Sequence, residues 1–241
     1  MSGTSNSQYT VAGTVLTMPV RVRKADVHSA MFSVDADAAQ RLIDYSGLRV
    51  YELRPNRAVI NLLLTRFVDC DLGQYNEFSF CVMVQPPGSD VRGLRGFGTA
   101  GTFVHRMQVD GAFTLEAGRQ IWGYPKILAD FTVRDGNPFG FDVSVDGALV
   151  VEMAIGRGLP VPMPSRPQSL LTYTNLDGTT RETAAEQLSS GFHARIGGAS
   201  LTLGEHPVAK ELASLGLPKK AFACMSIANA DMTFGDCREI G

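Results

Sequence analysis

Short strand-like segments dominate the pattern of hydrophobic and polar positions along the chain. Residues 20–34 begin with strict alternation, Val20-Arg21-Val22-Arg23, and end in a mainly apolar run. Alternation is typical of a strand with one buried face, and a continuous apolar run of a strand buried on both faces. We therefore expect strands at residues 20–34, 50–53, 58–68, 77–85, 102–109 and 222–234.

Few segments have the period of a helix. One helix is expected to begin with Asp35 or Asp37 as its N-cap, to run to Tyr45 and to end at Gly47. Two more are predicted at residues 112–121 and 207–215. Turn signals and breakers fill the gaps: Asp-Gly pairs at 135–136, 146–147 and 177–178, a glycine-rich loop at 88–101 and a stiff connector at 160–167.

Many antiparallel strands and few helices predict an α+β or mostly β fold. A closed barrel or cone-shaped sheet with a few outer helices would remove the open edges of so many strands. With 241 residues and 44% hydrophobic content the chain can bury a sizeable core. We expect a single domain over residues 1–241, with residues 1–10 flexible.

Composition and charge exclude several classes of function. The net charge is −2 with acid and base well mixed, so we expect no nucleic-acid partner and no anionic membrane surface. No apolar run approaches the roughly 20 residues of a membrane helix, and residues 1–8 lack a signal-peptide pattern. The four cysteines are scattered and predict buried, reduced thiols in a cytoplasmic protein. The four histidines share no metal-ligand spacing, and we expect neither a metal nor a cofactor.

Lys126 is the strongest chemical candidate. Lysines are scarce before residue 210, and this one stands in Trp-Gly-Tyr-Pro-Lys-Ile-Leu, an apolar setting that disfavours an ammonium. An ordinary lysine titrates near ~10.4, so its amine is neutral at pH 7 only after a downward shift of roughly 3 units. A neutral amine attacks carbonyl carbon and forms a Schiff base. The alternative is a surface lysine that follows a Tyr-Pro turn.

Three segments have the order and spacing of motifs from one known family. Residues 118–128 contain Gly-Arg-Gln, three further residues and Tyr-Pro-Lys-Ile; residues 72–77 read Leu-Gly-Gln-Tyr-Asn-Glu; residues 104–110 read Val-His-Arg-Met-Gln-Val-Asp. They resemble the lysine segment, the glutamate segment and a histidine-bearing strand of the acetoacetate decarboxylase family. Asp35-Ala36-Asp37-Ala38 is similar to the acidic start of that family's first helix. The resemblance implies a cone-like antiparallel β-barrel that assembles into homo-oligomers.

The chain departs from the family pattern around the lysine. The second lysine of the family, which helps to activate the first, is Ile127 here, and the family's Glu is Gln120. An acidic residue of the family has only Asn61 or Leu62 as its counterpart. The family's N-terminal arginine falls near position 25, which is alanine, with Arg23 and Lys24 close by.

The resemblance assigns the candidate site residues. Lys126 and Glu77 are expected to be catalytic, the first as the Schiff-base amine and the second as the proton-transfer group. The expected substrate-binding residues are Tyr124, Tyr75, Met107, His105 and Arg23. Structural alternatives stay open: Glu77 as a strand-end carboxylate paired with an arginine, the tyrosines as core residues, and His105 as a hydrogen-bonded core histidine.

Three functions are compatible with these residues. The first, and our prediction, is a Schiff-base lyase of acetoacetate decarboxylase type that acts on a small 3-oxo acid, with Arg23, Lys24 or Arg119 replacing the missing cation. The second is a Schiff-base aldolase or dehydratase on 2-oxo acids, which needs an arginine in the pocket to bind the carboxylate and no extra cation to lower the pKa of Lys126. The third is a non-catalytic member that binds a small carbonyl compound, with Lys126 protonated and paired with Glu77.

Overall fold

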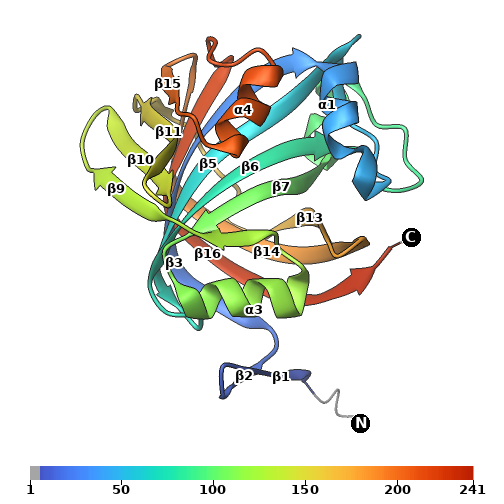
Figure 1. The fold of residues 1–241 in the computed structure, drawn as a ribbon, viewed down its shortest axis with the longest axis vertical. Coiled ribbons are helices and arrows are strands. Elements are labelled where there is room, and N and C mark those ends of the chain that lie inside the picture. The colour runs from blue at the N-terminus through green and yellow to red at the C-terminus, as the bar shows by residue number, and fades with distance from the viewer. Residues whose placement is uncertain (1–5, 241) are drawn as a thin grey trace.

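Seven strands form a closed ring. The computed structural model describes residues 6–240, and in it the ring runs β14-β13-β7-β6-β5-β3-β16, with β16 pairing back to β14 (Figure 1). The bounds are β3 Val20–Asp35, β5 Arg57–Cys70, β6 Tyr75–Val84, β7 Gly101–Val109, β13 Gln168–Leu176, β14 Thr179–Ile196 and β16 Ala223–Glu239. All neighbours in the ring are antiparallel except β13 and β7. The predicted closed, mostly antiparallel barrel is confirmed.

A second sheet covers part of the outside of this barrel. Its order is β15-β11-β10-β9, and Figure 1 shows it against one side of the barrel, next to helix α4. The bounds of this second sheet are β9 Asp130–Arg134, β10 Phe139–Val145, β11 Ala148–Ile155 and β15 Ala199–Leu203. The remaining described strands are short: β1 Gln8–Val11, β2 Thr14–Thr17, β4 Glu52–Arg54, β8 Lys126–Leu128 and β12 Leu159–Pro160.

The helices pack outside the barrel or across its ends. In Figure 1, α1 and α4 lie near one end and α3 lies near the other. The helical segments are α1 Ala36–Ile43, η1 Asp44–Ser46, α2 Gly93–Gly96, η2 Phe97–Thr99, α3 Ala112–Trp122 and α4 Pro207–Ser214. Within residues 6–240, none of them has the length and apolar character that a membrane crossing requires.

The period of two along β5 and β6 divides the core into two layers. Leu63 and Glu77 face the barrel interior. Their neighbours Leu62 and Phe78 point outward, into a core shared with the second sheet and the outer helices. A strand with apolar side chains on both faces therefore reads as one continuous apolar run, which explains the sequence of residues 58–68.

The predicted turns agree with the structure. The three Asp-Gly pairs join β9 to β10, β10 to β11, and β13 to β14, and Asp146 and Asp177 have positive φ angles of 50° and 54°. The glycine-rich segment 88–101 is not a uniform loop, because it contains α2 and η2. Of the residues expected to be flexible, 8–10 lie in the β1–β2 hairpin and 1–5 lie outside the described residues.

Candidate active site

Lys126 begins strand β8, directly after the turn that ends helix α3. Gly123 ends the helix in the left-handed region, with φ 66°, and its N–H donates to the carbonyl oxygen of Arg119. Glycine adopts this conformation without steric cost. β8 then pairs in parallel with β7 and places Lys126 opposite Met107, with both side chains inside the barrel.

The Lys126 amine lies between a carboxylate and a hydroxyl group. Nζ is 3.0 Å from Oε2 of Glu77 and 2.8 Å from Oγ1 of Thr114. The Lys126 and Glu77 side chains are only 3% and 12% exposed. The ring centroids of Tyr75 and Tyr124 lie 5.1 and 5.8 Å from Nζ, close enough for cation–π attraction. Lys126 is therefore a buried, paired amine and not a surface lysine.

Helix α3 contributes Thr114, which is not among the predicted site residues, and Gly118, which the sequence identified only as the first residue of the Gly-Arg-Gln motif. Thr114 accepts the hydrogen bond from Nζ, and Gly118 lies one turn later on the same face of the helix, against the stem of Lys126. The i, i+4 spacing of a small polar residue and a glycine was the available signal. It is a weak one, because many helices contain such pairs.

The surroundings of the amine contain no second cation among the described residues. Two neighbouring cavities, described below, lie at the amine, and no arginine, histidine or other lysine lines either of them. Arg119 donates to the carbonyl oxygen of Lys126, on the backbone and not at the amine. Lys24 lines a hollow on the outside of the barrel.

Arg23 does not contribute to the site, contrary to the expectation from sequence. Its side chain is 45% exposed and pairs with Asp69 at 2.9 Å and Asp71 at 2.7 Å. The alternation of β3 is the reason. Val20 and Val22 face the cavity beside Lys126, so the side chain of Arg23, the next residue after Val22, points to the opposite face of the strand.

His105 is also outside the site, and a β-bulge is the cause. Phe80 of β6 pairs with Arg106 and the next residue pairs with Val104, so His105 is the extra residue on β7. The bulge turns it outward, where its Nδ1 accepts from the hydroxyl of Tyr45 at 2.9 Å and its Nε2 donates to Glu211 at 3.2 Å. It is the hydrogen-bonded core histidine of the structural alternative.

Two tyrosines of the predicted set stand beside the amine as neutral phenols. Burial raises the pKa of Tyr75 and of Tyr124, and the nearby charge of Glu77 raises both further. Both hydroxyls therefore keep their protons at neutral pH and can act only as weak acids or hydrogen-bonding groups.

Two neighbouring cavities meet at this site. The smaller, of about 40 Å³, is lined by Lys126 together with Tyr75 and Trp122. The larger, of about 270 Å³, occupies the barrel interior and includes Met107. Both cavities are lined by Phe67, Glu77, Tyr124 and Phe234. We call the larger one the barrel chamber.

Asn61, and not Leu62, lines the barrel chamber. The position that the family resemblance assigns to an acidic residue is therefore a neutral amide here. Glu77 is thus the only carboxylate among the described residues that line either cavity.

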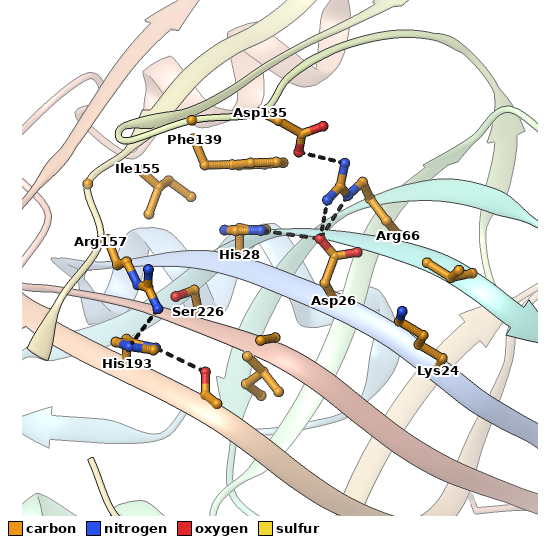
Figure 2. Close-up of a pocket in the computed structure, with 16 residues that line it drawn as sticks. Lys24, Asp26, His28, Arg66, Asp135, Phe139, Ile155, Arg157, His193 and Ser226 are labelled. Atoms are coloured by element: carbon orange, nitrogen blue, oxygen red, sulfur yellow. Dashed lines mark hydrogen bonds and ion pairs between the residues drawn. The ribbon is translucent and has the colours of Figure 1, made fainter. Parts of the chain in front are cut away.

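A third hollow, of about 460 Å³, lies on the outer face of the barrel and has a different character. Figure 2 shows that most of its charged groups are bonded to one another, whereas no interaction is drawn for Lys24. Arg66 bridges Asp26 at 2.6 Å and Asp135 at 2.8 Å, and Arg157 contacts His193 at 3.1 Å. These pairs satisfy each other, and none of them is a nucleophile with an adjacent base.

Comparison with known proteins supports a relationship along nearly the whole chain. The family model described as acetoacetate decarboxylase (ADC) matches residues 4–237. No curated protein sequence is significantly similar to this chain.

Several solved structures share the fold. Acetoacetate decarboxylase from Legionella pneumophila is 20% identical, with a TM-score of 0.66 over 92% of this chain and 87% of that one. The enduracididine biosynthesis enzyme MppR, complexed with the condensation product of pyruvate and imidazole 4-carboxaldehyde, is 17% identical, with a TM-score of 0.67 over 99% and 98%. An acetoacetate decarboxylase-like enzyme from Sphingomonas wittichii RW1 is 15% identical, with a TM-score of 0.56 over 91% and 93%.

Proposed function

The chain belongs to the acetoacetate decarboxylase family, and from this premise we propose that it is a Schiff-base lyase that decarboxylates a 3-oxo acid through an imine on Lys126. The observation that carries the proposal is the buried contact of 3.0 Å between Nζ of Lys126 and Oε2 of Glu77.

This contact provides a way to obtain the free amine without a second cation. Burial costs an ion pair much of its favourable free energy of hydration, whereas a neutral amine and a neutral carboxylic acid lose less hydration free energy. Transfer of one proton from Lys126 to Glu77 along the existing contact creates the neutral pair. Thr114 keeps accepting a hydrogen bond from the amine and holds its position.

The reaction then follows from these groups. The amine attacks the ketone carbon, and Glu77 returns its proton to the departing oxygen, so that water leaves and a protonated imine forms. The bond between C2 and the carboxylate breaks, its electron pair moves into the imine, and carbon dioxide leaves. The resulting enamine takes a proton from solvent at carbon, and hydrolysis of the imine by water releases the methyl ketone and restores Lys126.

The charge of the cavities favours decarboxylation over binding of a 2-oxo acid. A pyruvate-like substrate keeps its carboxylate during the whole reaction, and that carboxylate needs a cation in the site to compensate for the hydration that it loses on binding. Besides Lys126, the described lining of the two cavities offers none. A 3-oxo acid loses its charge as carbon dioxide, so an apolar site beside the Glu77 carboxylate destabilises the substrate more than the transition state.

Borohydride trapping tests the proposal directly. The protein is incubated with acetoacetate or with pyruvate, reduced, and its intact mass measured, with Lys126→Ala as the control. We expect an adduct of the acetone imine with acetoacetate, none with Lys126→Ala, and release of carbon dioxide.

Two outcomes would redirect the assignment. An adduct with pyruvate only would favour an aldolase or dehydratase, the kind of chemistry suggested by the condensation product bound to MppR. No adduct with any carbonyl compound would favour a binding protein in which the Lys126–Glu77 ion pair is permanent.

A further inference from the structure

The two cavities differ greatly in how much of a substrate they can hold. The cavity that Lys126 lines has a volume of about 40 Å³, little more than the roughly 30 Å³ that one water occupies in the liquid. Even acetoacetate, with seven non-hydrogen atoms, does not fit there. Any substrate must therefore place most of its atoms in the barrel chamber. Glu77 and Tyr124 line both cavities and so lie between the chamber and the amine.

The barrel chamber is larger than a four-carbon acid requires. Its volume is about 270 Å³. A cavity of roughly 150 Å³ holds benzene, with six non-hydrogen atoms, so by proportion this chamber holds about eleven. Acetoacetate would leave a gap of about four atoms, and the apolar side chains that face this gap would lack dispersion contacts with the substrate.

The lining of the chamber defines what the extra atoms are. One part of the wall is aliphatic or thioether, where β3, β5, β7 and β16 contribute Val27, Leu63, Val104, Met107, Ile227 and Met232. The other part also carries neutral polar side chains: Asn61, Thr65, Ser79, Thr102, Ser169, Thr172 and Gln187. Glu77 is the one charged residue in the described lining. A second carboxylate or a phosphate on the substrate would lose its hydration there without a cation to pair with.

From this volume and lining we propose that the substrate is a 3-oxo acid whose ketone carries an unbranched apolar chain. The carboxyl group, C2 and the ketone account for six of the roughly eleven non-hydrogen atoms, which leaves room for a chain of about five carbons. The inference rests on the proposed function, because it takes the Lys126 imine as the reaction centre. The chain lies among the aliphatic side chains, with the carboxylate end near Glu77.

A series of product ketones tests this chain length independently of turnover. Acetone, 2-pentanone, 2-heptanone and 2-nonanone are each trapped on the protein with borohydride, and the concentration for half-maximal labelling of Lys126 is measured. Each added CH₂ should lower that concentration about three- to fourfold up to 2-heptanone or 2-nonanone, as expected for full burial.

Filling the chamber provides the structural test. Ala185 on β14 lines the chamber and is buried, whereas its neighbour Ala184 is exposed. Ala185→Leu should move the optimum to a shorter ketone and weaken labelling by 2-nonanone at least tenfold. Ala184→Leu should show the same dependence of labelling on chain length as the unmodified protein. Gly98→Leu is a second filling variant, because a Cβ there meets no atom within 4 Å.

The outcomes separate this inference from the proposed function. Labelling by acetone that does not improve with chain length would overturn the inference and leave the imine chemistry standing. The same holds if both filling variants fold and keep the original optimum. Failure of every ketone, acetone included, would instead overturn the proposed function itself.

Discussion

Gly118 and Lys126 are packed so closely that the helix residue has no room for a side chain. A Cβ at position 118 would lie 2.6 Å from Cε, 2.7 Å from Cδ and 3.1 Å from Nζ of Lys126. Carbon atoms in contact normally lie about 3.5–4.0 Å apart. Helix α3 therefore presses on the aliphatic stem of the lysine and fixes where its amine lies relative to Glu77.

The variant Gly118→Ala should lose imine formation while it keeps its fold. The new methyl group displaces the flexible lysine stem and moves the amine away from Glu77, so we expect borohydride labelling to slow at least tenfold. Alanine is favoured over glycine in a helix by roughly 1 kcal/mol, which offsets part of the clash. Labelling rates and thermal unfolding measured together check this, with Glu116→Ala on the exposed side of α3 as the control. Normal labelling in Gly118→Ala would contradict the positioning role.

Glu77→Gln removes the proton acceptor but preserves the shape of the side chain. The amide oxygen can still accept a hydrogen bond from Lys126, so the site should stay assembled. Proton transfer by a positioned group is worth about 10²–10⁴ in rate, and we expect kcat for decarboxylation to fall by about that factor with a much smaller change in KM. Glu116→Gln serves as the matched control. A variant that retains kcat within threefold would exclude Glu77 as the proton-transfer group.

Much of the architecture could be predicted because it depends on local patterns. Alternation and apolar runs identify strands, Asp-Gly pairs identify hairpins, and the resemblance to the family assigns Glu77 and Lys126 to one candidate site. Arg23 could have been placed correctly from the same alternation, since Val20 and Val22 on either side of Arg21 already define the inward face of β3.

The outward position of His105 could not be predicted in this way. A single extra residue in β7 reverses the facing of the side chains before it, and the bulge depends on how β6 pairs with β7, a contact between separate segments. The size of the barrel chamber is likewise set by side chains from at least six strands. No local pattern in the sequence encodes it.

Arg23→Gln should have little effect on activity or stability. The guanidinium is half exposed, and its two ion pairs with Asp69 and Asp71 are at the surface, where such pairs contribute roughly 0–1 kcal/mol. We expect kcat/KM for decarboxylation within about twofold of the unmodified protein and a shift of at most a few degrees in Tm. Steady-state kinetics and calorimetry measure both. A tenfold loss of activity in a normally folded variant would mean that Arg23 acts on the substrate after all.

The cluster around Glu211 should make the fold sensitive to acid. Burial alone would raise the pKa of Glu211, but hydrogen bonds from Arg106 and His105 outweigh burial and lower it to about 2. In the unfolded chain a glutamate titrates near ~4.3. The stabilisation is therefore complete above about pH 5 and is lost as the pH falls toward about 2.

His105 acts in the same direction. Its burial, with the charge of Arg106, lowers the pKa of its imidazole and outweighs the opposing effect of Glu211. The unfolded histidine takes up a proton below about pH 6.5 more readily than the folded one. Acid therefore favours the unfolded state at both residues, from about pH 6.5 downward for His105 and from about pH 5 downward for Glu211.

Glu211→Gln should remove the acid-dependent part of this stability. Urea unfolding at pH 7 should show the variant less stable by roughly 1–2 kcal/mol, a value reduced for the partial exposure of the carboxylate. The difference should shrink as the pH is lowered from 5 to 3, because protonation then removes the same charge from the unmodified protein. Glu205→Gln, at an exposed carboxylate just before α4, is the control and should differ by less than about 0.5 kcal/mol throughout. A difference for Glu211→Gln that stays constant from pH 7 to pH 3 would mean that its charge does not stabilise the fold.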